Sequence, residues 1–130
     1  MSKDSWKITR KYHTKDISNS TFLITGGAGF IGSNLAQYLM DNNAKKVIIL
    51  DDLSNGYLKN IENYQNDSRL VFVEGDITDV STCNKVVQGV DYISHQAALG
   101  SVPRSLKTPL ITHEANASGY LNMLTAAKDA

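Results

Sequence analysis

The stretch that decides the fold is TGGAGFIG, residues 25–32. Its glycines at 26, 29 and 32 follow an apolar run and precede a helical pattern. Gly26 suits a tight turn, Gly29 leaves room for a phosphate against the backbone, and Gly32 lets a helix pack closely on a strand. A helix that begins here also directs free N–H groups and the positive end of its dipole at an anion. The stretch therefore predicts a strand–turn–helix unit that binds a dinucleotide.

Four short apolar runs separated by helical patterns indicate an α/β fold. Between the first two runs, Ile31, Leu35 and Leu39 form an apolar stripe on a helix that we expect to cover the sheet and to end near Asn42–Asn43. Right-handed crossovers predict a Rossmann-type doubly wound parallel sheet over residues 21–130, with strand order 3-2-1-4 and a ligand between the first and fourth strands. The predicted strands are Thr21–Thr25, Lys46–Leu50, Leu70–Glu74 and Val90–His95.

The two ends of the chain have different patterns. Residues 1–20 form a predicted N-terminal extension that is polar and basic. It is interpreted either as a basic arm for nucleic acid or as a solvated helix laid on the domain, and the helix is favoured. At the other end, residues 109–130 predict a helix with one apolar face. That face carries Leu110, His113, Ala117, Leu121, Leu124 and Ala127.

Composition excludes several classes of protein. The 130 residues hold 13 Lys and Arg against 13 Asp and Glu, so no overall positive field favours nucleic acid or a membrane surface as partner. No apolar run approaches the roughly 20 residues that span a bilayer. Cys83 is the single cysteine, which excludes an internal disulfide and favours a packing role in a reducing compartment, the cytoplasm.

Asp51 ends the second predicted strand, where a carboxylate accepts hydrogen bonds from the hydroxyls of an adenosine ribose. A 2′-phosphate there would be repelled, so the cofactor is predicted to be NAD and not NADP. Asp52 adds a second negative charge or serves as a solvated turn residue. Ser54, Asn55 and Gly56 form a polar turn that caps the following helix or touches the ribose, with capping favoured.

Taken in order, TGGAGFIG, LDDLSNG, EGDITD and HQAALGSVPRS resemble the motifs of extended short-chain dehydrogenase/reductases that act on nucleotide sugars. HQAALGSVPRS is most similar to bacterial UDP-N-acetylglucosamine 4-epimerases. The resemblance implies an enzyme that binds NAD and a UDP-sugar, oxidises C4 of the sugar transiently and returns the hydride to the other face. It also implies a homodimer built through a helical bundle that includes residues 109–130.

The resemblance implies roles for individual residues. The backbone N–H groups of Phe30 and Ile31 would meet the pyrophosphate, and Asn116 would support the strand ends and the cofactor. The adenine would lie against Asp76 and Ile77, the nicotinamide against Gln96, Ala97 and Ala98, and the sugar near Gly100, Ser101 and Val102. Asp52 departs from the family pattern, in which Asn is usual.

Two further side chains have competing interpretations. His95 has no carboxylate or nucleophile nearby in the motif, so a place in the cleft wall is favoured over a catalytic role. Arg104 either pairs with a diphosphate or caps local carbonyl groups, and both interpretations stay open.

The family's catalytic Tyr, with Lys four residues later and a Ser or Thr, has no match in residues 1–130, because no tyrosine here has that Lys. The resemblance implies that these groups follow residue 130 and that residues 1–130 alone are inactive. Two alternatives to the epimerase stay open. One is a nucleotide-sugar 4,6-dehydratase or decarboxylase on the same scaffold. The other is a dinucleotide-binding regulatory module without turnover.

Overall fold

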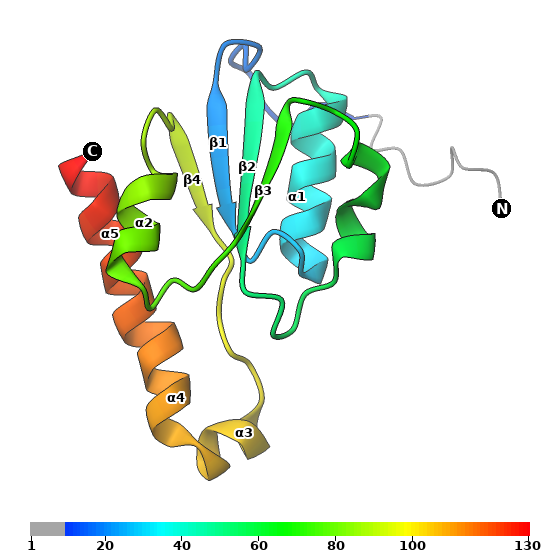
Figure 1. The fold of residues 1–130 in the computed structure, drawn as a ribbon. Helices are drawn as coiled ribbons and strands as arrows, with labels where there is room; N and C mark the ends of the chain where they lie inside the picture. The colour runs from blue at the N-terminus through cyan, green and yellow to red at the C-terminus, as the bar shows by residue number, and fades with distance from the viewer. Residues whose placement is uncertain (1–9) are drawn as a thin grey trace, which may run out of the picture.

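In a computed structural model, which describes residues 10–130, four parallel strands form one sheet in the order β3-β2-β1-β4 (Figure 1). The predicted fold class and strand order are confirmed. The predicted second strand is one residue shorter than β2, and β4 begins two residues later than predicted, because a turn from Val87 to Val90 and a bend at Asp91 precede it. The strands are β1 (Thr21–Thr25), β2 (Lys46–Asp51), β3 (Leu70–Glu74) and β4 (Tyr92–His95).

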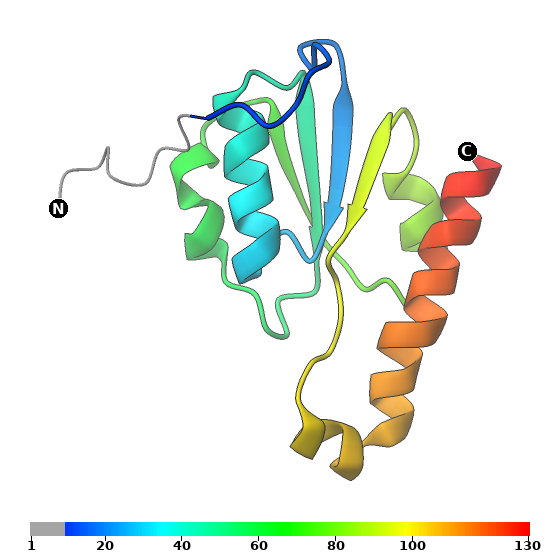
Figure 2. The ribbon, with the colours of Figure 1, turned by 180° about the vertical axis from the view of Figure 1, so that it is seen from behind.

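Helices cover both faces of the sheet (Figures 1 and 2). Alternate side chains of β2 explain this arrangement, since Val47 and Ile49 pack in one core cluster and Ile48 and Leu50 in the other. A strand that is buried on both faces reads as a continuous apolar run, as β2 does. On one face lie α1 (Phe30–Asp41) and the 3-10 helix η2 (Leu58–Tyr64), and on the other lie α2 (Val80–Val86) and α5 (Gly119–Asp129).

The predicted end of α1 is confirmed, since the helix stops at Asp41 and Asn43 turns the chain with a φ of 62°. The predicted stripe is wrong in part. Leu35 and Leu39 are half-buried at the edge of the core, whereas Ile31 is 61% exposed. The side of α1 that is buried carries three small residues and Met40, and the small residues allow a closer approach of the helix than a row of large side chains would. The buried residues of α1 are Gly32, Ser33, Ala36 and Met40.

The helix predicted over residues 109–130 is interrupted. It consists of α4 (Pro109–His113), the π-helical turn η3 (Glu114–Ser118) and α5, and a short α3 (Val102–Lys107) precedes it. Gly119, Met123 and Ala126 are buried, whereas Leu110, Leu121 and Leu124 of the predicted apolar face are exposed. The π turn changes the rotation of the helix by adding a residue, so a simple repeat does not identify the buried side.

Residues 10–20 form no helix, so the favoured interpretation of the extension is wrong for this segment, and residues 1–9 lie outside the described structure. The segment lies against α1 through the Tyr38 hydroxyl, which accepts from the N–H of Tyr12 at 2.7 Å and lies 2.6 Å from Nδ1 of His13. Ile17 is buried in the same cluster as Ala36. The segment therefore packs on the domain without regular structure.

The described residues give information on membrane spans, metal sites and Cys83. No helix among residues 10–130 is long and apolar enough to cross a membrane, and no group of His, Cys, Asp and Glu in that range is arranged to hold a metal ion. Cys83 is buried, donates to the carbonyl of Ile77 at 3.2 Å, and has its thiol pKa raised by burial. These contacts are those of a packing residue.

The buried face of α1 can be tested with a matched pair of substitutions. Met40→Ala removes a side chain that is 2% exposed and should lower the free energy of unfolding by about 2–5 kcal/mol. Ile31→Ala should change it by no more than about 0.5 kcal/mol, because that side chain is mostly in solvent. Urea denaturation followed by circular dichroism measures both values. A larger loss for Ile31→Ala would show that the predicted stripe faces the core after all.

Candidate functional site

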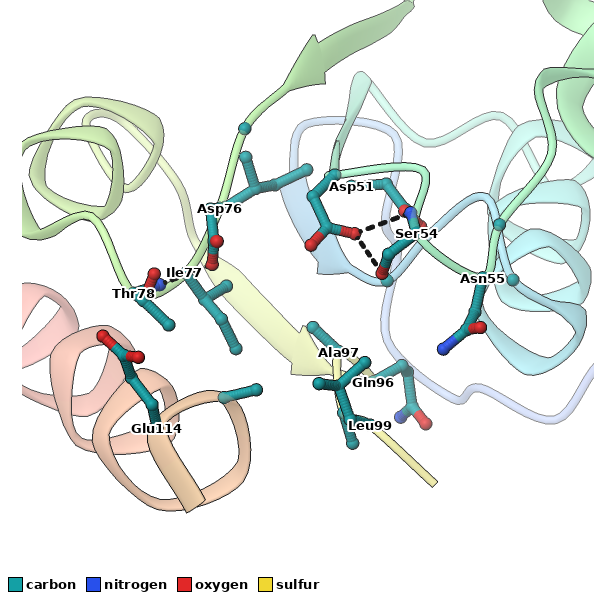
Figure 3. Close-up of a pocket in the computed structure, with 18 of the residues that line it drawn as sticks. Asp51, Ser54, Asn55, Asp76, Ile77, Thr78, Gln96, Ala97, Leu99 and Glu114 are labelled. Carbon is teal, nitrogen blue, oxygen red and sulfur yellow. Dashed lines mark hydrogen bonds between the residues drawn. The ribbon is translucent and has the colours of Figure 1, made fainter. Parts of the chain in front are cut away.

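A cavity of about 310 Å³ opens at the carboxyl ends of the strands, where ligands bind in open α/β sheets (Figure 3). It lies between the loops that follow β1, β2, β3 and β4, and residues of α4 and η3 also line it. The lining residues are Gly26, Gly29, Leu50, Asp51, Asp52, Ser54, Asn55, Gly56, Gly75, Asp76, Ile77, Thr78, Gln96, Ala97, Ala98, Leu99, Ile111, Glu114 and Ala115.

The glycine loop brings three backbone segments together. Gly26 has a φ of 67°, donates to the carbonyl of Leu50 at 2.8 Å, and leaves space in which a Cβ would lie 2.8 Å from the nitrogen of Ala97. A Cβ on Gly32 would collide with the carbonyl oxygen of Gly26 and lie 2.7 Å from Cα of Gly27. Neither backbone segment can move aside cheaply, so a side chain is excluded at both positions.

Gly29 caps α1 in an extended conformation without a side-chain hydrogen bond. The N–H groups of the first turn are therefore left for another acceptor, and the positive end of the dipole lies beside the cavity. The side chains of Phe30 and Ile31 are exposed and lie outside the lining. The predicted contact of these two residues with a pyrophosphate involves only their backbone N–H groups.

Asp51 joins the end of β2 to the glycine loop. Its carboxylate is buried and accepts from the N–H of Ala28 and the N–H of Leu53, each at 2.9 Å. Two charge-assisted hydrogen bonds fix the carboxylate at the cavity wall. Gly56 lies close by, where a Cβ would be 3.0 Å from both Oδ1 of Asp51 and the backbone of Ala28.

Asp52 also lines the cavity, but its carboxylate has a local partner. Oδ1 accepts from the N–H of Ser54 at 2.9 Å and from the hydroxyl of Ser54 at 2.7 Å. This arrangement is an Asx turn, in which a side chain stabilises the loop that follows a strand. The turn interpretation of Asp52 is therefore supported, while the residue keeps its place beside the cavity. The favoured capping role of Ser54, Asn55 and Gly56 is wrong, because η2 begins after Tyr57 and has no side-chain cap.

The wall after β4 is held by Thr25, which is not among the predicted site residues. Its hydroxyl is buried, accepts from the N–H groups of Gln96 at 3.1 Å and Ala97 at 3.2 Å, and lies 2.8 Å from Nδ1 of His95. In the sequence, this role of Thr25 is indicated only by its place as a polar residue at the end of an apolar strand. Thr25 thus fixes the segment that faces the glycine loop.

His95 lies outside the cavity lining and points to Thr25 on one side and to the ring of Tyr120 on the other, with ring centroids 5.5 Å apart. Burial lowers the pKa of its imidazole below the ordinary value. Its position behind the wall, together with the described contacts, supports the non-catalytic interpretation.

Helix α4 and the π turn contribute residues that were not predicted. Ile111 of α4 and Glu114 and Ala115 of η3 line the cavity. Asn116 lies outside the lining and forms a pair of hydrogen bonds with the backbone of Leu99. Its Oδ1 accepts from the N–H at 2.7 Å, and its Nδ2 donates to the carbonyl at 2.9 Å. Asn116 therefore supports the wall segment from the helix side. A π turn at a functional site is a recurrent arrangement.

The third strand ends in a turn at Asp76, whose Oδ1 accepts from the N–H of Thr78 at 2.8 Å. Ile77 is buried and receives a hydrogen bond at its carbonyl from Nδ2 of Asn122 at 3.0 Å. Both residues line the cavity (Figure 3).

The predicted sugar-side residues lie outside the lining. Ser101 caps α3, and Val102 is exposed. Arg104 donates to the carbonyl of Gly100 at 3.4 Å and reaches Oδ1 of Asn55 at the same distance. Arg104 thus caps a local carbonyl and also contacts the loop after β2.

The structure brings together most of the predicted cofactor residues and leaves others outside the lining. Gly32 and Asn116 shape the cavity from behind, and Phe30 and Ile31 flank it. The predicted cofactor residues that line the cavity are Gly26, Gly29, Asp51, Asp52, Ser54, Asn55, Gly56, Asp76, Ile77, Gln96, Ala97 and Ala98.

The charged side chains that line the cavity are all acidic. Asp51, Asp52, Asp76 and Glu114 line it, and no Lys or Arg is among its lining residues in the described range. Backbone N–H groups at the glycine loop are the positive partners that remain for a diphosphate. These residues fit a dinucleotide with free ribose hydroxyls and disfavour an additional phosphate.

Comparison with known proteins agrees with this geometry. The family model described as GDP-mannose 4,6 dehydratase matches residues 23–130. The chain belongs to this family. Its relatives include the low-salt glycan biosynthesis protein Agl12 of Haloferax volcanii, with 40% identity over 83% of this chain and 35% of that protein. The chain spans about a third of the length of the curated relatives it matches.

Two solved structures resemble the chain closely. DesIV, a dTDP-glucose 4,6-dehydratase from Streptomyces venezuelae with NAD bound, has a TM-score of 0.80 and 39% identity, covering 85% of this chain and 36% of that one. The UDP-N-acetylglucosamine 4-epimerase of Methanobrevibacter ruminantium has a TM-score of 0.78 and 36% identity, covering 86% and 35%. The predicted resemblance to this group of nucleotide-sugar enzymes and the prediction of NAD as its cofactor are confirmed.

Substitution of Gly32 tests the close contact in the loop. Gly32→Ala should lower the free energy of unfolding by about 1–3 kcal/mol, because the new methyl group meets backbone atoms on two sides. Gly100→Ala is a matched control, since a Cβ there has no atom within 4 Å. Urea denaturation of both variants gives the comparison. Equal midpoints for Gly32→Ala and the unsubstituted protein would show that the loop tolerates a side chain.

Proposed function

We propose that residues 21–130 are the NAD-binding portion of a UDP-N-acetylhexosamine 4-epimerase that interconverts UDP-GlcNAc and UDP-GalNAc. The observation that carries the proposal is the cavity itself, in which a side-chain-free turn at Gly26, the fixed carboxylate of Asp51 and a wall of small residues after β4 face one another. This combination suits a dinucleotide that lies along the strand ends with its reactive ring at the small-residue wall.

In this proposal each loop binds one part of NAD. The turn at Gly26 and Gly29 and the N–H groups of Phe30 and Ile31 bind the pyrophosphate, with Gly32 keeping α1 close. Asp51 accepts from the adenosine ribose hydroxyls, and the Asp52–Gly56 turn, with Ser54 and Asn55, borders them. Asp76 and Ile77 contact the adenine.

Gln96, Ala97 and Ala98 border the nicotinamide, and Asn116 holds their segment in place through Leu99. Bound NAD supplies a hydride acceptor for C4 of the sugar. The alanines leave room for the sugar and the nicotinamide to stack, because a larger side chain would keep the reacting atoms apart. Gly100, Ser101 and Val102 continue from this wall and border the sugar.

Similarity to the Methanobrevibacter enzyme, together with the HQAALGSVPRS motif, supports the epimerase. A 4,6-dehydratase is the second candidate, supported by the family model and by the similarity to DesIV. A decarboxylase on the same scaffold is a variant of that candidate. All three enzymes begin with oxidation at C4 of a nucleotide sugar, so residues 21–130 would serve each of them in the same way.

We further propose that the acid–base pair lies outside residues 1–130, since no tyrosine there has a lysine four positions later, and that this segment alone does not turn over substrate. Leu121 and Leu124 of α5 are exposed, which supports a homodimer through a helical bundle. The single, buried cysteine supports the cytoplasm as the compartment.

The function is tested on the protein expressed from its whole open reading frame. Denaturation should release NAD, identified by mass, and incubation with UDP-GlcNAc should give UDP-GalNAc, measured by NMR. Release of NADP would contradict the cofactor assignment. Formation of a 4-keto-6-deoxy sugar from a nucleotide-sugar substrate would identify a dehydratase. Bound NAD without turnover of any nucleotide sugar would favour a regulatory module.

Asp51 provides a quantitative prediction. Asp51→Asn should weaken NAD binding about tenfold to a hundredfold, because a charge-assisted hydrogen bond to the ribose contributes about 1.5–3 kcal/mol. Asp52→Asn is the comparison, and its effect should be smaller because that carboxylate is already bonded to Ser54. Isothermal titration with NAD measures both. An equal loss in the two variants would show that Asp51 has no particular role in ribose binding.

A further inference from the structure

The buried hydroxyl of Thr25 lies at the centre of a small, part-buried hydrogen-bond network. It has one proton to donate and two lone pairs with which to accept. The N–H groups of Gln96 and Ala97 point at it from 3.1 and 3.2 Å, and Nδ1 of His95 lies at 2.8 Å. The N–H of Gln96 is also shared with the carbonyl of Thr25 at 3.0 Å.

Two of these three neighbours can only donate, so they approach the lone pairs of the hydroxyl. Among the described contacts, Nδ1 of His95 is the one acceptor for the hydroxyl proton. This network is satisfied when the imidazole is neutral and carries its single proton on Nε2.

We propose that His95, as a neutral acceptor at Nδ1, is a positioning residue that acts through Thr25 to hold the wall of the cofactor cavity, and that protonation of the imidazole loosens this wall. The proposal rests on the proposed function, in which that wall borders the nicotinamide.

Protonation at Nδ1 would place a third donor against the hydroxyl of Thr25. An oxygen with two lone pairs cannot accept three N–H groups at full strength, so the contact to Gln96 or Ala97 would lengthen. The displaced segment is the one that lies against Gly26, where the backbones are too close for even a Cβ. A shift of the wall there would change the shape of the cavity directly.

The surroundings of His95 favour the neutral form. Thr25 of β1 and the ring of Tyr120 of α5 are its neighbours, and Tyr120 is the ionisable group among them. Within residues 10–130, no carboxylate or cation acts on the imidazole, and burial alone lowers its pKa. The folded protein therefore binds a proton here less readily than the unfolded chain.

The sign of the pH effect follows from that lowered pKa. At a pH well above the ordinary histidine pKa of about 6.5, the imidazole is neutral in both the folded and the unfolded state, and the wall keeps all its hydrogen bonds. As the pH falls below 6.5 and through the lowered pKa, the folded state takes up the proton at a cost, and both stability and NAD affinity should decline.

The first experiment reads the tautomer in the protein expressed from its whole open reading frame. With ¹⁵N-labelled histidine, long-range ¹H–¹⁵N spectra near pH 7.5 should show His95 with its proton on Nε2 and none on Nδ1. A proton on Nδ1 would overturn the proposal. This result does not depend on whether the protein binds NAD, so it separates a failure of this inference from a failure of the proposed function.

The second experiment measures the dissociation constant for NAD by titration between about pH 7.5 and pH 5. We expect the unsubstituted protein to bind NAD about tenfold more weakly at the lower pH. His95→Asn places an amide oxygen near the position of Nδ1 and does not titrate, so its dissociation constant should change less than about twofold over the same range. The same pH dependence in both proteins would overturn the proposal, since a packing role alone would leave the profile unchanged.

Discussion

The close approach of three backbone segments at the end of β1 is the constraint on which the rest of this structure depends. Parallel pairing brings Thr25 level with Leu50 of β2 and with His95 of β4. The chain must then leave β1, turn and start α1 within the space between its two neighbours. Only residues without side chains fit at Gly26 and Gly32, because the atoms that surround them are mostly backbone atoms. The position of α1, the opening of the cavity and the path after β4 all follow from that turn.

Side-chain hydrogen bonds then fix the loops around the turn, and each of them joins two elements. Asp51 connects the end of β2 to Ala28 of the glycine loop, Thr25 connects β1 to the segment after β4, and Asn116 connects that segment to η3. Asp51 and Thr25 are buried, and a buried polar group that is bonded specifies one geometry, because a lost partner leaves an unsatisfied group. The cavity is therefore shaped by polar residues even though most of its surface is apolar.

Local patterns in the sequence were enough to predict the strands, their order and the glycine loop. The strands and the glycine loop depend on residues that are close in the chain, and β2 is a continuous apolar run because both of its faces are buried. The strand order follows from right-handed crossover connections. The packing side of α1 was predicted wrongly at Ile31, since apolar spacing does not reveal that Ala36 and small neighbours contact the sheet. The roles of Thr25 and Glu114 depend on contacts between distant segments, and the π turn that directs Glu114 to the cavity has no simple sequence signal.

The loops that line the cavity would bind different parts of the cofactor. In the proposed arrangement the loops after β1, β2 and β3 surround the adenosine, and the segment after β4 borders the nicotinamide, while η3 lines the cavity beside the loop after β3 (Figure 3). Gly100, Ser101 and Val102 lie outside the lining. A dehydratase and an epimerase match the chain almost equally, at 39% and 36% identity. That near equality is expected if residues 21–130 mainly bind the cofactor, because enzymes that share NAD but differ in their sugar chemistry need the same adenosine half and different groups beyond it.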